Sequence, residues 1–396
     1  MSHRFTTGID VGTHQVKVVV LEQFYENEKI IRKVVATGIA PTFGMRHGYI
    51  TNTGEVTESI KNAIHMASRV LKSPIDHAFI SIGSIGLQGT ISTGSIAISR
   101  ADSEITDLDL ENVSEACKNA VPNNLLINRK ILHTIPINYK IDGKPVLGRP
   151  NGLKGSKLEV KTLFITCLEH HLNDLIQSIK DAGVEIDDVI ASPLAASMVT
   201  LTKSQKIVGC VLANIGSETV SIVVHENGIP ISLEVLPIGS NDITNDIALG
   251  LKIPLEEAES IKTGENHGLE FSKKKLDEII EARLSDIFEL IEAHLKKIGR
   301  SGLLPAGIIL SGGGSSIYAI EDIAKQTLKL PSKTVGLPID NGWKNSLIKD
   351  SFWSVAYGLC ILGFTIDEDD SFKANKFKFV KKAKNSIGAW IKQFLP

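Results

Sequence analysis

Short β-branched runs and longer amphipathic stretches alternate along most of the chain. The runs predict buried strands, and apolar residues at spacings of three and four predict helices. The expected strands are residues 5–10, 16–21, 78–82, 187–190, 207–213 and 307–310. The expected helices are residues 56–71, 171–182, 194–201 and 320–328. This alternation is typical of an α/β architecture.

Two stretches interrupt the alternation. Residues 84–160 contain short Ser/Thr/Gly-rich alternating segments and one polar helix, which predicts a small inserted α+β unit. Its expected elements are strands 90–98, 130–139 and 158–164 and helix 109–120. Residues 241–300 are mostly helical, with helices expected at 242–250, 255–262 and 272–299.

One motif occurs twice, half a chain apart. Residues 10–20 (DVGTHQVKVVV) align with residues 214–224 (NIGSETVSIVV), an offset of 204 residues. In both copies an apolar strand ends in an acid or amide, passes a glycine and a hydroxyl residue, and returns as a β-branched strand. We therefore expect two copies of one α/β fold.

The two glycine-hydroxyl turns have the composition of a phosphate-binding site. Each exposes backbone N–H groups without a bulky side chain, and two turns facing one another would grip a polyphosphate from both sides. Asp10, at the end of the first strand, is placed to hold a Mg²⁺ through its waters. A third glycine loop, residues 311–314, follows a strand and suits close backbone approach to a nucleoside.

A single turn of this kind is usually a simple hairpin. Its occurrence twice in register, together with a triple-glycine loop after a later strand, favours a nucleotide site. The Walker A and Rossmann glycine patterns are absent from the sequence, so those folds are disfavoured.

Composition changes this picture only at the C-terminus. Lys and Arg number 43 against 45 Asp and Glu, a net charge of -2 that gives no sign of a nucleic-acid partner. The cysteines lie far apart, which predicts buried thiols in a reducing compartment. The N-terminal residues lack a signal-peptide stretch, and the apolar region 353–366 is too short to span a membrane, so we expect neither export nor a transmembrane helix.

Residues 373–396 differ from the rest of the chain. They carry seven lysines and no acidic residue, and they follow an acidic run at residues 367–370. Without these seven lysines, 36 basic residues face 45 acidic ones, so a body of about -9 precedes an end of +7. Apolar side chains then recur at helical spacing over an arc of roughly 140°. They are Ile387, Trp390, Ile391, Phe394 and Leu395.

Two interpretations of this tail compete. An amphipathic C-terminal helix is often docked on its own domain, whereas Trp and Phe on the apolar face and a polybasic approach favour a helix in the interface of an anionic membrane. The helix is only about ten residues long, so a single copy should bind weakly. Many copies on a polymer should bind with avidity.

On these motifs the chain resembles the superfamily of actin, sugar kinases and heat-shock chaperones, and within it the FtsA family of bacterial cell-division proteins. Residues 8–20 and 213–224 resemble the two phosphate loops, 309–317 the adenosine loop, and 255–262 a helix that touches ribose and adenine. The resemblance implies an actin-like fold, in which two duplicated α/β domains with inserted subdomains face each other across a nucleotide cleft.

The same resemblance implies ATP and Mg²⁺ as ligands. Asp10 and Asn214 take the catalytic positions, and Asp10 holds the metal through water. The implied nucleotide contacts are Gly12, Thr13, Gln15, Lys17, Gly216, Ser217, Glu218, Thr219, Glu259, Lys262, Gly312, Gly313 and Gly314.

The resemblance also suggests a division of the chain. The expected parts are a first core of residues 1–83, completed by 161–192 and about 352–366; an inserted unit, 84–160; a second core, 193–240, completed by 301–351; a helical subdomain, 241–300; an acidic-then-basic linker, 367–384; and a membrane-targeting helix, 385–396.

One position departs from the superfamily pattern. Most members carry an acid at the start of the second phosphate loop, and this chain has Asn214. An amide adds no negative charge for the metal, so we expect ATP binding with weak or no hydrolysis. In a second interpretation, Asn214 merely ends a strand and Asp10 alone supports catalysis.

The FtsA resemblance implies an adaptor that polymerises, recruits division proteins and ties the tubulin-like protein FtsZ to the cytoplasmic face of the cell membrane at the septum. Residues 241–300 would take up the FtsZ C-terminal peptide. There Arg283 either pairs with an acid of the peptide or is a solvated charge. The inserted unit would serve polymer contacts or later division partners.

Two alternatives remain open. A PilM-like adaptor of a pilus machine shares the loops and the inserted unit but is not expected to carry the basic tail. An actin-fold ATPase or kinase would need a general base or a substrate pocket, and the sequence identifies neither.

Overall fold

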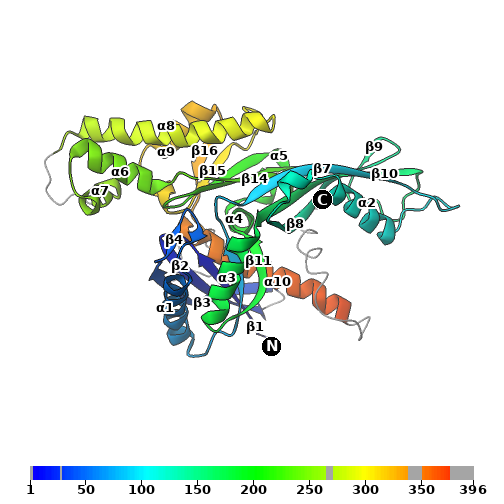
Figure 1. Cartoon of the computed structure of the whole chain (residues 1–396), viewed down its shortest axis with the longest axis horizontal. Helices are drawn as coiled ribbons and strands as arrows, with labels where there is room; N and C mark the ends of the chain where they lie inside the picture. The colour runs from blue at the N-terminus through cyan, green and yellow to red at the C-terminus, as the bar shows by residue number, and fades with distance from the viewer. Residues whose placement is uncertain (1–2, 27–28, 265–270, 338–349, 375–396) are drawn as a thin grey trace.

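Two units with the same strand order form the centre of the molecule (Figure 1). The computed structural model describes residues 3–26, 29–264, 271–337 and 350–374. The first sheet has the order β11-β6-β1-β2-β3, in which β1 is antiparallel to β2 and parallel to β6. Its strands are β1 (Arg4–Val11), β2 (Gln15–Glu26), β3 (Lys29–Pro41), β6 (His77–Ile82) and β11 (Glu185–Ala191).

The second sheet repeats this arrangement. Its first five strands have the order β16-β15-β12-β13-β14, and β12 is antiparallel to β13 and parallel to β15. The predicted duplication of one α/β fold is therefore confirmed. The strands are β12 (Cys210–Ile215), β13 (Val220–Glu226), β14 (Ile229–Leu236), β15 (Ile308–Ser311) and β16 (Ser332–Thr334).

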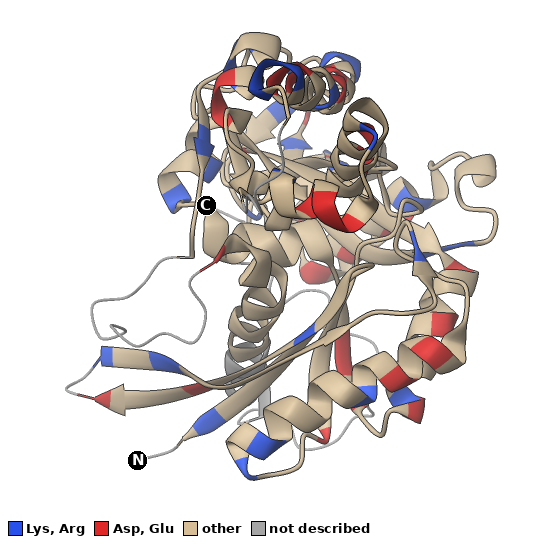
Figure 2. Cartoon of the chain, turned by 90° about the vertical axis from the view of Figure 1, so that its left-hand side faces the viewer, with Lys and Arg blue, Asp and Glu red and all other residues tan. Residues whose placement is uncertain are grey.

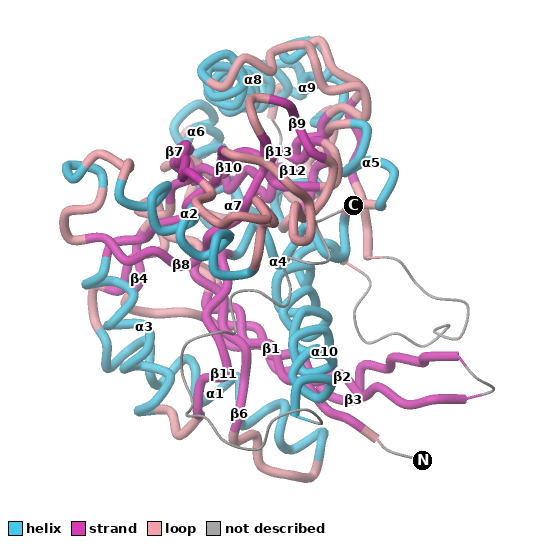
Figure 3. The backbone as a smooth tube through the Cα atoms, turned by 90° about the vertical axis from the view of Figure 1, so that its right-hand side faces the viewer, coloured by secondary structure: helices cyan, strands magenta, loops and turns pink. Residues whose placement is uncertain are grey.

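Helices cover both faces of the first sheet, which explains the unbroken β-branched run in β2 (Figure 3). Val18 and Val20 belong to the core shared with α1, whereas Val19 and Leu21 pack with α10. The helices that pack around this unit are α1 (Thr53–Leu71), α3 (Glu169–Asp181), α4 (Ser192–Thr200) and α10 (Ser354–Ala374).

The second unit carries the helical segment on one side (Figure 1). The long helix α8 buries a stripe of apolar residues, including Leu276, Ile280 and Leu284, as its spacing predicts. Its exposed side carries Lys, Arg, Asp and Glu interspersed (Figure 2). The helices are α6 (Ser240–Leu251), α7 (Leu255–Lys262), α8 (Lys273–Lys297) and α9 (Ile320–Leu328).

An α+β unit leaves the first sheet after β6 and projects along the long axis (Figure 1). Its four strands extend the second sheet in the order β14-β7-β10-β8-β9, joined through the pair Glu234 and Gln88. The sequence does not predict this continuity. The elements are β7 (Gln88–Ala97), α2 (Asp107–Asn119), β8 (Arg129–Ile141), β9 (Lys144–Val146) and β10 (Lys157–Leu168).

The expected strand at residues 207–213 is wrong at its start. Residues Lys203–Val208 form helix α5, because Thr202 at the N-cap and Gln205 in the first turn make a capping box. Gly209, with φ of 111°, then allows the chain to turn into β12. The sequence interpretation also missed β3 and β14, the antiparallel partners of β2 and β13.

The C-terminal part is described only to Ala374. Helix α10 runs through the acidic residues 367–370, so the first part of the predicted linker is helical. The predicted membrane helix, with Ile387, Trp390 and its other apolar residues, lies outside the described residues. No helix among those the structure describes combines the length and the apolar character that crossing a membrane requires.

Candidate functional site

A cleft of about 1170 Å³ is lined by residues of both sheets. This volume is above the ~300–1,000 Å³ of most small-molecule sites, so it leaves room for a nucleotide and its phosphates. Every residue predicted to contact nucleotide or metal lines this cleft: Asp10, Gly12, Thr13, Gln15, Lys17, Asn214, Gly216, Ser217, Glu218, Thr219, Glu259, Lys262, Gly312, Gly313 and Gly314.

The two glycine-hydroxyl turns have the same backbone geometry. Gly12 N donates to Gln15 O at 3.2 Å, and Gly216 N donates to Thr219 O at 2.8 Å. A Cβ on either glycine would lie 3.0 Å from the carbonyl oxygen that accepts that glycine's own hydrogen bond. Glycine at these two positions therefore lets each turn close tightly without pushing away its own backbone.

Asp10 is held by two donors at the floor of the cleft. Ser81 Oγ donates to Asp10 Oδ1 at 2.7 Å, and Lys17 Nζ donates to Asp10 Oδ2 at 3.2 Å. The carboxylate is thus oriented by β2 and β6, the strands on either side of β1.

The matching place in the second unit carries no charged pair. In the strand register, Asn214 of β12 lies opposite Ser221 of β13 and Ser311 of β15. These positions correspond to Asp10, Lys17 and Ser81 in the first unit. The two halves of the cleft therefore share a backbone but differ in charge.

The third glycine loop lies against this amide. Gly312 has φ of 87°, and a Cβ there would lie 2.3 Å from Asn214 Oδ1, so only glycine fits without displacement. Ser315 Oγ and Ser351 Oγ both donate to Gly312 O. A Cβ on Gly313 would meet nothing within 4 Å. The loop thus presents open backbone to the cleft.

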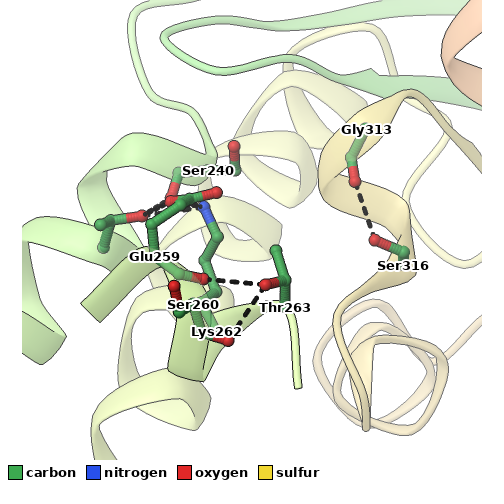
Figure 4. A network of polar contacts seen from close by, with 8 residues as sticks. Ser240, Glu259, Ser260, Lys262, Thr263, Gly313 and Ser316 are labelled. Carbon is green, nitrogen blue, oxygen red and sulfur yellow. Dashed lines mark hydrogen bonds and ion pairs between the residues drawn. The ribbon is translucent and has the colours of Figure 1, made fainter. Parts of the chain in front are cut away.

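Helix α7 contributes an ion pair at the opposite wall (Figure 4). Lys262 Nζ lies 2.6 Å from Glu259 Oε2 and also donates to Thr244 Oγ1 at 2.8 Å and to Ser240 O at 3.3 Å. Burial alone would raise the pKa of Glu259, but the hydrogen bonds from Lys262 and Thr244 outweigh it and lower the pKa. Both α7 residues named by the sequence are therefore held in one fixed hydrogen-bond network.

The sequence interpretation missed several residues in or beside the cleft. Ser81, Ser240 and Thr244 fix the predicted charged groups, and His47 and Gly48 reach the two glycine-hydroxyl turns from a separate turn. Ser81 lies inside the predicted strand 78–82, two residues before Gly83, which is a faint signal. The other four belong to no recurring motif in the sequence.

Arg283 lies on α8 and already has partners within the chain. Its Nε and Nη2 donate to the two carboxylate oxygens of Asp246 at 2.6 and 3.1 Å, and Nη1 lies 3.3 Å from Asp286. The Asp246 hydrogen bonds raise the pKa of Arg283. The guanidinium is therefore oriented by α6 rather than merely solvated.

Family comparison agrees with the geometry. Residues 211–358 match the family model "Cell division protein FtsA", and residues 86–166 match "SHS2 domain inserted in FTSA". A cell division protein FtsA of Borreliella burgdorferi is 31% identical over 99% of this chain and 98% of its own length. The chain belongs to the FtsA family. The FtsA proteins of Bacillus subtilis and Escherichia coli K12 are 31% and 24% identical, over 81% and 98% of this chain and 76% and 96% of their own lengths.

Solved structures show the same fold at low sequence identity. A PilM-PilN type IV pilus biogenesis complex chain has a TM-score of 0.67 at 16% identity, covering 90% of this FtsA chain and 98% of its own. MreB5 of Spiroplasma citri bound to ADP has a TM-score of 0.52 at 13% identity, covering 93% and 98%. The actin-like fold expected from the sequence is confirmed. The family matches favour FtsA over the pilus-adaptor and kinase alternatives.

Proposed function

We propose that this FtsA binds ATP with Mg²⁺ in the cleft between its two units. The observation that carries the proposal is that two turns of the same backbone geometry, an open glycine loop and the Glu259–Lys262 pair all line one cavity. The turns suit phosphate oxygens, and the α7 pair suits the polar edge of a nucleoside.

The donor set fits a magnesium nucleotide. Mg²⁺ prefers one or two carboxylates with phosphates and water, and Asp10 supplies one oriented carboxylate where the two turns meet the cleft. Lys17 lies against that carboxylate and brings positive charge to the same turn. Bound Mg²⁺ would offset phosphate charge.

Hydrolysis should be slow in this cleft. Asn214 stands where a second acidic residue is expected. Its amide is a weak base and adds no negative charge for a metal. Because phosphoryl transfer depends on positioning and electrostatics, the loss of this charge weakens turnover more than binding. Asp10 and Asn214 are thus proposed to support binding and weak catalysis.

The nucleotide-bound chain would act as an adaptor in cell division. The helical segment 241–300, with Arg283 held by Asp246, offers an oriented cation to the acidic FtsZ C-terminal peptide. Such a pair is stronger when the guanidinium is already ordered. The inserted unit is proposed to serve contacts between FtsA copies or with later division proteins.

The C-terminal residues would anchor this adaptor to the cytoplasmic face of the membrane. An acidic body of about -9 is repelled by anionic lipid, while the +7 end is attracted by ~1 kcal/mol per lysine. The apolar arc around Trp390 would enter the interface. A filament of FtsA would display many such ends and bind by avidity.

Vesicle flotation tests this proposal. Full-length protein, ATP and anionic vesicles are mixed with FtsZ of the same organism, and FtsZ recovered with the vesicles is measured. We expect recovery to depend on this chain and to fall sharply with Trp390→Glu, but not with Phe43→Glu, an exposed aromatic in the first unit. FtsZ recovery that ignores the chain, or membrane recovery unchanged by Trp390→Glu, would refute the adaptor role.

A further inference from the structure

A two-residue turn of the first unit contacts both phosphate loops, one in each unit. The short strands β4 (Met45–Arg46) and β5 (Tyr49–Ile50) pair as a hairpin and leave His47 and Gly48 at its tip. Both have positive φ, 47° and 77°, as a type I′ turn requires. A left-handed histidine costs free energy, so its surroundings must hold it there.

Those surroundings are the two phosphate loops. His47 N donates to Glu218 Oε2 at 2.6 Å, and the His47 ring lies 3.2 Å from Glu218 O through Nδ1. Gly48 N donates to Thr13 Oγ1 at 3.2 Å. One turn therefore binds the second loop through a charge-assisted hydrogen bond and the first loop through a hydroxyl.

The other side of the turn packs against the start of the inserted unit. Ile85 N donates to His47 O at 3.3 Å, and a Cβ on Gly48 would lie 2.6 Å from Ser84 Cα. A Cβ on Gly86 would lie 2.8 Å from Tyr49 Oη. Residues 84–86 connect β6 to β7, so the turn touches the cleft and the base of the inserted unit at once.

This base is itself braced. Arg129 on β8 donates to the carbonyl of Gly86 and to Thr166 Oγ1 on β10. The Tyr49 ring stacks on His171 of α3, with centroids 3.7 Å apart and planes 14° apart. A shift of the turn would therefore be transmitted to the strands of the inserted unit rather than absorbed by a loose loop.

We propose that the His47–Gly48 turn is a clasp that couples the phosphate content of the cleft to the position of the inserted unit. The proposal rests on the nucleotide binding argued above. Glu218 is a carboxylate in the cleft lining, and each added phosphate increases the repulsion that it feels. A diphosphate leaves the clasp closed, and a triphosphate pushes Glu218 away from the His47 amide and opens it.

Reciprocal coupling gives the first test. Glu218→Gln removes the charge and weakens the clasp, so it should raise the affinity for a non-hydrolysable ATP analogue relative to ADP by at least about fivefold. Glu257→Gln, a half-buried position of α7 outside the cleft lining, should leave that ratio unchanged. Fluorescence anisotropy of labelled nucleotides measures both. An unchanged ratio in Glu218→Gln would overturn the clasp.

The position of the inserted unit gives the second test. Spin labels at Lys144→Cys on β9 and Lys273→Cys on α8 report the distance between the inserted unit and the second unit, because the native cysteines are buried. We expect a shift between ADP and the ATP analogue, and a Glu218→Gln protein that resembles the ATP state already with ADP. Equal distances in all states, with nucleotide bound, would refute the clasp alone. Absence of nucleotide binding would refute the proposed function with it.

Discussion

Lys262 is 8% exposed, yet its ammonium lies 2.6 Å from Glu259, whose side chain is half exposed to the cleft. The pair stands one turn apart on α7, so the helix alone sets its spacing. Thr244 from α6 closes the network by bonding both partners. The charged edge that a nucleoside would meet is therefore fixed before any ligand arrives.

Lys262→Met tests this edge. The apolar side chain keeps the volume but removes the donor, so we expect at least a tenfold loss of affinity, or ~1.4 kcal/mol. The affinities for ATP and ADP should fall alike, because α7 is proposed to face the nucleoside rather than the phosphates. Anisotropy of labelled nucleotides measures it, and Lys275→Met on exposed α8 surface is the control. Loss confined to ATP would place Lys262 at the phosphates and contradict the assignment.

Asn214→Asp tests the proposed cause of slow ATP hydrolysis. The substitution restores a second carboxylate at the matching position of Asp10 without changing size. We expect ATP hydrolysis to rise at least about tenfold, a barrier lower by ~1.4 kcal/mol, measured as phosphate release.

Asn245→Asp is a matched control, since Asn245 on α6 also lines the cleft but belongs to neither glycine-hydroxyl turn. It should bring no increase. An Asn214→Asp protein as slow as the unmodified chain would show that the missing acid does not limit hydrolysis.

Contacts between residues close in the sequence could be predicted, and contacts between distant residues could not. The two glycine-hydroxyl turns were predictable, because each is a local strand-turn-strand unit in which the glycine N–H donates to the carbonyl three residues ahead. The Ser81 to Asp10 and His47 to Glu218 contacts join residues 71 and 171 apart, and no periodicity records them. The pairing of Gln88 with Glu234 was hidden for the same reason.

Local competition explains the other failure. Ile207 and Val208 continue a β-branched run into β12, and the run alone favours a strand. The capping box of Thr202 and Gln205 starts a helix first, and Gly209 provides the break. Propensity over a few residues was overridden by a cap and a glycine.

Arg283→Ala tests the proposed peptide site. Removing the guanidinium leaves Asp246 without its partner and deletes the cation offered to an acidic peptide. We expect the FtsZ C-terminal peptide of the same organism to bind at least about tenfold more weakly in fluorescence anisotropy. Arg69→Ala, exposed on α1 in the other unit, should bind normally. Normal binding by Arg283→Ala would remove this residue from the interface.

His294→Leu tests the contact between α8 and the second sheet. Its Nε2 lies 2.8 Å from Ser232 Oγ, and its Nδ1 contacts the carboxylate of Glu234, the residue that pairs with the inserted unit. His294→Leu leaves a buried hydroxyl and a carboxylate without this partner. We expect a loss of about 3 kcal/mol in the free energy of unfolding. Urea denaturation followed by circular dichroism measures it, with His65→Leu on exposed α1 surface as the control.

The pH dependence of this loss identifies its cause. The hydrogen bond from His294 is the largest influence on Glu234 and lowers its pKa in the folded chain. A carboxylate whose pKa is lowered by folding stabilises the folded state at any pH above its pKa in the unfolded chain. This contribution disappears as the pH falls through the pKa of the folded chain. The difference between His294→Leu and the unmodified chain should therefore stay constant from near pH 7 down to the ordinary carboxylate pKa of 4.5 and shrink only as the pH falls below it. A difference that does not shrink below pH 4.5 would mean that lost packing, not the His294–Glu234 bond, accounts for the destabilisation.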